Sequence, residues 1–116
     1  MMINLKTIFE GFTVDGVAIP VSFMYYNGHG GTYITYQLTD EDGSFSGDDE
    51  LLGYAVYYDI DIYSKTDYTR IISEVKTLLK ANGLMYQPMR SSGDMYETDT
   101  KYYHRTLCFK ALKEEI

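Results

Sequence analysis

The sequence predicts an α+β domain, in which a mainly antiparallel β-sheet carries one or two helices packed on one face. Two segments, Thr32 to Thr39 and Leu52 to Ser64, alternate apolar and polar residues with a period of two, as β-strands do. A third segment, about Thr66 to Ala81, repeats apolar residues at helical spacing. The 116 residues are 45% apolar and 23% charged, which suits one folded domain spanning residues 1–116.

The N-terminal elements are expected to be short. Apolar residues at helical spacing predict a short amphipathic helix: Leu5, Ile8, Phe9 and Phe12. Asp15-Gly16 lies between two β-rich runs and predicts a two-residue hairpin turn, because both central positions of such a turn need a positive φ. Pro20 confines this hairpin to a sheet edge. The segment Val21 to Tyr26 is apolar without a clear period, so its conformation stays open.

The segment Leu52 to Ser64 has the clearest strand pattern. One set of alternate positions is suited to a core: Tyr54, Val56, Tyr58, Ile60 and Ile62. The other set is aromatic and acidic: Tyr57, Asp59, Asp61 and Tyr63. We expect the first set to face the core and the second to face solvent or a partner protein.

The helix that follows carries one apolar stripe: Tyr68, Ile71, Ile72, Val75, Leu78 and Leu79. Ser64 with Asp67 resembles a capping box at its start, and Asn82-Gly83 supplies a left-handed exit at its end. Three more segments complete the prediction: a strand from Leu84 to Met89 interrupted by Pro88, a polar loop from Ser91 to Thr100, and a closing strand from Lys101 to Leu112.

The charge of the chain is uneven. The formal net charge is −7, and residues 40–50 hold six of the 17 acids and no base. These six are predicted to lie in one acidic loop: Asp40, Glu41, Asp42, Asp48, Asp49 and Glu50. An EF-hand aligned on Gly43 would have Leu38 at its first ligand position and strands at its flanks, so a solvated or lumen-facing loop is favoured over a calcium site. The acidic balance also argues against sequence-independent nucleic-acid binding.

Candidate catalytic and ligand-binding residues are few. Cys108 is the single cysteine, which excludes an internal disulfide and a multi-cysteine metal site. Cys108 and His104 share one strand face, but no third orienting group is evident, so a packed cysteine is favoured over a nucleophile. His29 lies in the glycine-rich segment 28–31, which lacks a lysine and precedes a strand, so a plain loop is favoured over a phosphate site. We therefore predict no catalytic residue, no metal and no cofactor.

A tyrosine-rich sheet face is the remaining functional feature. Thirteen tyrosines are present, some in adjacent pairs that could stack nucleic-acid bases, but base-stacking proteins also need a basic groove. Asp59 and Asp61 could serve as an acid–base pair, although an exposed sheet face explains them equally well. An interface with another protein is favoured. Its predicted residues are Tyr57, Asp59, Asp61, Tyr63, Tyr33 and Gln37.

The order of these motifs resembles a known family. The run from Gly31 to Gln37 (Gly-Thr-Tyr-Ile-Thr-Tyr-Gln) precedes the acidic loop, and the run from Asp59 to Ser64 precedes a helix and two final strands. This order is similar to that of tail-completion, or tail-terminator, proteins of long non-contractile-tailed bacteriophages (siphoviruses) and their prophages. The resemblance covers about Pro20 to Ala111, and the N-terminal part departs from it, since a longer helix is common there.

The resemblance implies a structural virion protein without catalytic residues. Its subunits would form a ring, typically of six, that ends the tail tube and joins it to the head–tail connector proteins. DNA would pass through the ring as cargo, and an acidic lumen would ease its transit. The expected location is the head-proximal end of the tail, after assembly in the bacterial cytoplasm. No apolar run reaches the roughly 20 residues of a membrane span, and the first residues lack a signal-peptide layout. The alternatives are a head-closure or other minor tail protein, a small calcium- or ligand-binding module, and a cysteine-dependent enzyme.

Overall fold

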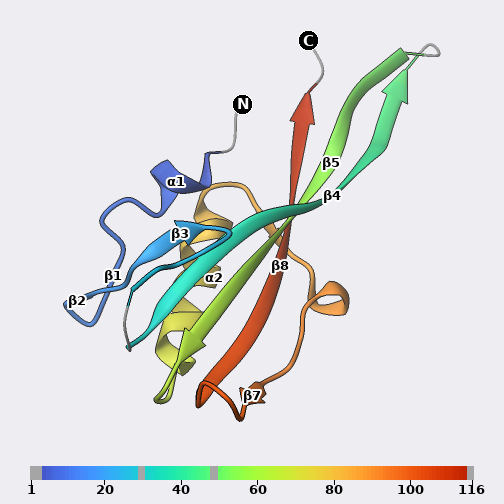
Figure 1. Cartoon of the computed structure of the whole chain (residues 1–116). Helices are drawn as coiled ribbons and strands as arrows, with labels where there is room; N and C mark the ends of the chain where they lie inside the picture. The colour runs from blue at the N-terminus through green and yellow to red at the C-terminus, as the bar shows by residue number, and fades with distance from the viewer. Residues whose placement is uncertain (1–3, 29–30, 48–49, 115–116) are drawn as a thin grey trace.

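One twisted β-sheet organises the chain (Figure 1). The computed structural model describes residues 4–28, 31–47 and 50–114. The sheet has the order β3-β4-β5-β8-β6, and β7 also pairs with β8. Its strands are β3 (Val21–Phe23), β4 (Tyr33–Gly47), β5 (Glu50–Ser64), β6 (Met85–Tyr86), β7 (Met95–Glu97) and β8 (Tyr102–Glu114). Only the β3–β4 pair is parallel, so the predicted α+β class and mainly antiparallel sheet are confirmed.

The N-terminal helix and hairpin turn agree with the prediction, but the hairpin is a two-stranded sheet of its own and not an edge of the main sheet as expected from Pro20. Helix α1 (Leu5–Ile8) is a single turn, and Asn4 caps it by accepting a 3.2 Å hydrogen bond from the Thr7 amide. Strands β1 (Thr13–Val14) and β2 (Val17–Ala18) form a separate hairpin. The turn residues Asp15 and Gly16 have φ values of 51° and 81°, which is the backbone that the Asp-Gly signal predicted.

Helix α2 (Thr69–Ala81) covers one face of the sheet. It begins three residues later than predicted, because Ser64 ends β5 in a buried position where its Oγ bonds Thr32 Oγ1 at 2.8 Å and accepts from the Thr66 amide at 3.2 Å, outside the helix. Asp67 instead accepts from the Thr69 amide at 2.9 Å. The helix ends as predicted: Gly83 has a φ of +86°, and the Leu84 amide donates to the Leu79 carbonyl at 3.0 Å.

The core lies between α2, α1 and the facing side of the sheet. Its centre consists of fully buried aliphatic and aromatic residues: Ile34, Val56, Ile60, Ile62, Val75, Leu79, Leu107 and Phe109. The predicted core positions of the 52–64 strand for which side chains are described all pack in or against this cluster. The alternation of β5 therefore identified the correct face.

The predicted acidic loop is wrong as a loop. Residues 40–47 continue β4, and Glu50 begins β5, in a register that runs from Tyr33↔Tyr63 to Gly47↔Glu50. The alternating pattern ends near Thr39, but pairing along β5 extends the strand beyond it despite the low strand propensity of Asp. Figure 1 shows this pair projecting past both helices, and the molecule measures 52 × 28 × 23 Å. Asp48 and Asp49 lie outside the described residues.

The segment between β6 and β7 follows the outer edge of β8. A 3-10 helix, η1, spans Pro88–Arg90. The Gln87 amide donates to the Cys108 carbonyl at 2.8 Å, and the Ser92 amide donates to the Thr106 carbonyl at 2.9 Å. Residues 91–100, predicted to be entirely loop, contain β7, because β7 continues this pairing along β8.

Candidate functional site

The six predicted interface residues lie together on the sheet face opposite α2, which we call the open face. Alternate positions of β4 and β5 bring them together, with Tyr33 opposite Tyr63 and Gln37 opposite Asp59. Alternate positions of β8 extend the face with His104, Thr106 and Cys108, which pair with Tyr63, Asp61 and Asp59. All six are half-buried, except Tyr57, which is 9% exposed. The grouping predicted from sequence is therefore a contiguous surface.

A ladder of stacked rings crosses one end of the open face. Tyr26 stacks on Tyr33, Tyr33 on Tyr63, and Tyr63 on His104, with centroid separations of 4.7, 4.7 and 4.1 Å. Tyr102 meets Tyr33 edge-on at 5.5 Å. Burial, with a smaller contribution from the charge of Asp61, raises the pKa of Tyr63 to about 12. These rings satisfy one another within the chain, so the ladder is a packed layer and not a set of free tyrosines.

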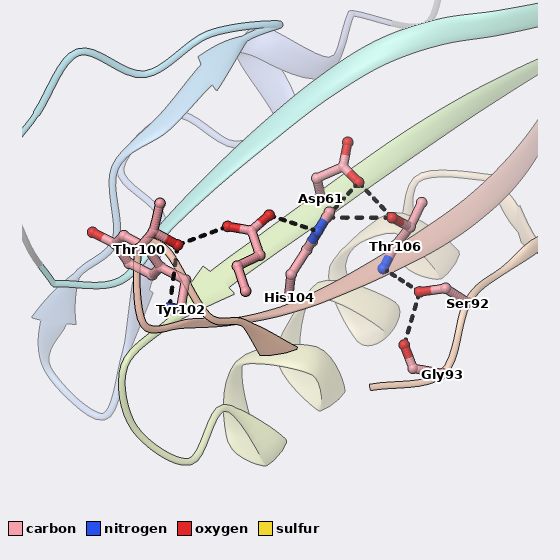
Figure 2. A network of polar contacts seen from close by, with 8 residues as sticks. Asp61, Ser92, Gly93, Thr100, Tyr102, His104 and Thr106 are labelled. Atoms are coloured by element: carbon pink, nitrogen blue, oxygen red, sulfur yellow. Dashed lines mark hydrogen bonds and ion pairs between the residues drawn. The ribbon is translucent and has the colours of Figure 1, made fainter. Parts of the chain in front are cut away.

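Asp61 is the centre of a polar network beside the ladder (Figure 2). Its Oδ1 accepts a 2.5 Å bond from Thr106 Oγ1 and lies 3.0 Å from His104 Nε2. A carboxylate oxygen only accepts, so Nε2 carries the proton of this bond. On its other side, His104 Nδ1 lies 3.8 Å from Glu97 Oε2. The imidazole thus connects β5 to β7 across β8.

The order of these groups does not match that of a catalytic triad. A triad needs the imidazole between the hydroxyl and the carboxylate, so that the imidazole can take the hydroxyl proton. Here the carboxylate of Asp61 lies between Thr106 and His104, and Thr106 Oγ1 is 3.4 Å from His104 Nε2. Thr106 therefore donates its hydroxyl proton to the Asp61 carboxylate and not to the imidazole of His104. The geometry gives this network a role in orienting side chains on the open face.

A small apolar cluster occupies the middle of the open face and consists of Ala55, Tyr57 and Cys108. Cys108 is buried, as predicted for a packed residue, and burial together with nearby Asp59 raises its pKa to about 11. Burial, and secondarily the charge of Asp61, raises the pKa of Asp59. A Cys108–His104 pair, which the sequence analysis disfavoured, does not form, because Thr106 separates the two residues on the face and His104 bonds Asp61.

Arg90 folds over this cluster from the β8 edge. Its guanidinium carbon lies 3.7 Å from the centre of the Tyr57 ring, and its Nη2 lies 2.9 Å from Asp40 Oδ2. Asp40 and Glu41 are exposed at the base of the projecting β4–β5 pair. Asp42 and Glu50 lie on its paired strands. Four of the six predicted acids are thus placed on strands.

Sequence analysis missed Arg90 and the roles of His104 and Thr106. Arg90 lies between the predicted strand, which ends at Met89, and the predicted loop, which begins at Ser91, and nothing in its local sequence places it over Tyr57. His104 and Thr106 alternate with Cys108 in the closing strand, so a signal for a shared face was present. Their partner Asp61 could be found only from the β5–β8 register. His29 lies outside the described residues.

Searches of the chain for known features gave three results. Residues 4–28, 31–47 and 50–114 contain no cluster of three or more His, Cys, Asp or Glu residues suited to a metal ion. Within the same ranges, no helix is long and apolar enough to cross a membrane. No protein-family model matches the chain, and no curated protein sequence matches it.

Proposed function

We propose that this chain is a structural subunit of a bacteriophage or prophage tail. In this role, copies of the chain form a ring of the tail-terminator kind, which ends the tail tube and joins it to the head connector proteins. Two lines of reasoning support the proposal: the resemblance of residues 20–111 to tail-completion proteins, and the projecting pair of strands. The second is the structural observation on which the proposal depends.

The projecting pair, which we call the arm, consists of residues 42–47 of β4 and 50–55 of β5. Among the described residues, β8 pairs with the arm only as far as Gly53↔Glu114, and beyond that pair β4 and β5 pair with each other alone. Two-stranded ribbons of this kind are marginally stable in water without further packing. The arm extends past both helices (Figure 1). A second molecule that packs against it would therefore increase its stability.

The charge of the arm suits a ring through which DNA passes. Residues 40–50 hold six of the 17 acids, whereas the remainder of the chain has 11 acids and 10 bases. A concentration of negative charge at the inner wall repels the DNA backbone and keeps it from binding there. In the proposed ring each arm packs against a neighbouring subunit beside the lumen, and the bodies of the subunits contact the tail tube protein.

The test measures solution mass by light scattering across a concentration series and images any large species by negative stain. The expected result is a closed ring with a central channel. A matched variant replaces residues 43–54 with Asn-Gly, which joins the facing residues Asp42 and Ala55 by a two-residue turn. This variant should keep the circular dichroism spectrum of the body and lose the ring. A large species without a channel, or a ring that forms equally well without the arm, would count against the proposed function.

A further inference from the structure

The exposed large apolar side chains of the described residues gather at two opposite edges of the sheet. Apart from Val17 on the β1–β2 hairpin, one group lies at the β3 and β4 edge: Phe23, Met24, Tyr25 and Leu38. The other group lies at the β6, β7 and β8 edge: Met85, Met89, Met95, Tyr96, Tyr103 and Leu112. Tyr25 is 73% exposed and Met89 is 97% exposed. Apolar groups concentrated in this way mark sites where another protein surface covers them.

Both edges also contain strand backbone without a strand partner in the described part of the chain. The pairing of β3 with β4 ends at Phe23↔Tyr36, so the outer edge of β4 has no strand partner from Leu38 onward. β6 pairs with β8 only as far as Met85↔Lys110, so the outer edge of β8 is unpaired from Ala111 onward. Unpaired strand edges are templates for pairing with another chain.

The two edges carry opposite charge. At the β4 edge, residues 38–47 hold three acids (Asp40, Glu41 and Asp42) and no base, and one of these acids, Asp40, is paired with Arg90 of the same chain. At the β8 edge, residues 110–114 hold two bases (Lys110 and Lys113) and one acid (Glu114), and Lys76 of α2 lies over the Tyr86 ring of β6 with its Nζ 4.3 Å from the ring centre. Two copies that meet through the same edge would place like charges together, whereas copies that meet through different edges place acids near bases.

We infer that the β4 edge of one copy, from Leu38 onward, binds the β8 edge of a second copy, from Lys110 onward. This contact is head-to-tail, because each copy contributes a different surface, and each copy retains one unused edge for a further copy. Repetition of such a contact gives a ring if the rotation closes and a filament if it does not. The inference rests on the proposed ring function for its biological setting, but its edges can be tested without that function.

Two exposed leucines, one on each edge, provide the test. Leu38→Lys adds a base to the β4 edge, where it faces the basic β8 edge of a neighbour. Leu112→Glu adds an acid to the β8 edge, where it faces the acidic β4 edge. Each variant alone should raise the dissociation constant for self-association at least about tenfold. Val17→Lys, at a more exposed position outside both edges, is the control and should assemble like the unaltered chain.

The decisive experiment mixes the two variants at equal concentration and measures mass by analytical ultracentrifugation. The Leu38→Lys chain retains a native β8 edge, and the Leu112→Glu chain retains a native β4 edge, so the mixture should associate into heterodimers through this native junction. The altered junction places the introduced base against the introduced acid, so larger mixed species are also expected, whereas neither variant alone should associate. Circular dichroism of each variant checks that the fold is intact. A mixture that stays monomeric overturns the inference. So does an unaltered chain that is monomeric up to about 1 mM, because even weak self-association would be detected at that concentration.

Failure of this inference can be separated from failure of the proposed function. If both leucine variants still form a ring, the proposed edge contact is wrong but the proposed ring function is not contradicted. Heterodimers from the mixed variants, together with open filaments from the unaltered chain, support the edges and reject the ring.

Discussion

The two faces of β5 are held by different kinds of contact. On the face toward α2, Val56, Ile60 and Ile62 are fully buried and contact aliphatic side chains from the helix and the neighbouring strands. On the open face, Asp61 and Tyr63 are half-buried and contact specific partners through hydrogen bonds and ring stacking. The first face is stabilised by area removed from water, and the second by directional contacts between side chains.

The difference shows how a sheet face that no helix covers can still be ordered by the rest of the chain. Elements at the sheet edges reach over it: Arg90 from η1 covers Tyr57, and Glu97 from β7 approaches His104. The open face is therefore partly ordered by the chain itself. The exposed apolar surface lies at its edges and not at its centre.

The largest difference between the faces should appear when Ile60 is truncated. Ile60→Ala removes a fully buried side chain at the centre of the core face and should lower the free energy of unfolding by about 2–5 kcal/mol. Urea unfolding followed by circular dichroism measures this loss. The exposed control Thr77→Ala on α2 should change stability little. A loss for Ile60→Ala below that of the open-face variants would show that the helix-covered face is not the main source of stability.

The reactivity of Cys108 tests whether the middle of the open face is closed to solvent. Its pKa of about 11 leaves little thiolate at pH 8, and its sulfur is buried. A thiol reagent should therefore label the native chain at least about 100-fold more slowly than the chain unfolded in urea. Rapid labelling of the native chain would mean that Arg90 and the cluster beneath it open readily, and it would revive the cysteine-dependent enzyme alternative.

Tyr63 tests how much the ring ladder contributes. Tyr63→Ala removes the stacking contacts with Tyr33 and His104 and should cost about 1–3 kcal/mol of unfolding free energy. Tyr63→Phe keeps both stacking contacts and is the matched control. It should lower the unfolding free energy much less than Tyr63→Ala does. If Phe were as destabilising as Ala, the phenol oxygen and not the stacking would be the important feature.

The smallest expected effect concerns the charge of Asp59. Burial raises its pKa in the folded chain above the unfolded value, so the folded state takes up a proton more readily as the pH falls. Ionised Asp59 therefore disfavours folding at neutral pH, and this cost is relieved as the pH falls through the folded-state pKa. Asp59→Asn should raise the melting temperature at pH 7, with a gain that shrinks toward pH 4. A gain that is independent of pH would mean that the ionisation of Asp59 is not the cause, and exposed Asp99→Asn provides the control.

Local patterns predicted much of this structure. The stripe from Tyr68 to Leu79 predicted α2 and its buried face, because helical spacing places those residues on one side whatever they pack against. The Asp15-Gly16 pair predicted a hairpin turn, because few other residues accept its backbone angles. The alternation from Leu52 to Ser64 separated the core face from the open face.

Other features depended on contacts between distant segments. The parallel pairing of β3 with β4 has no local signal, since it is set by where residues 21–23 find an unpaired edge. The arm extends through acids that disfavour strands, because β5 supplies a pairing partner along its length. α2 begins at Thr69, where Asp67 accepts from the Thr69 amide, whereas Ser64 is buried against Thr32 on a distant segment.

The sequence by itself determined which side chains share a face, because the periodicities of the strand and the helix are properties of the local backbone. It thereby grouped Tyr33, Gln37, Tyr57, Asp59, Asp61 and Tyr63 correctly. Only the tertiary structure decided what those residues touch. Register between strands is a non-local quantity, and a shift of one residue would turn His104 and Thr106 away from Asp61. The path of η1 along β8 likewise placed Arg90 over Tyr57, because its backbone had to pair with that edge.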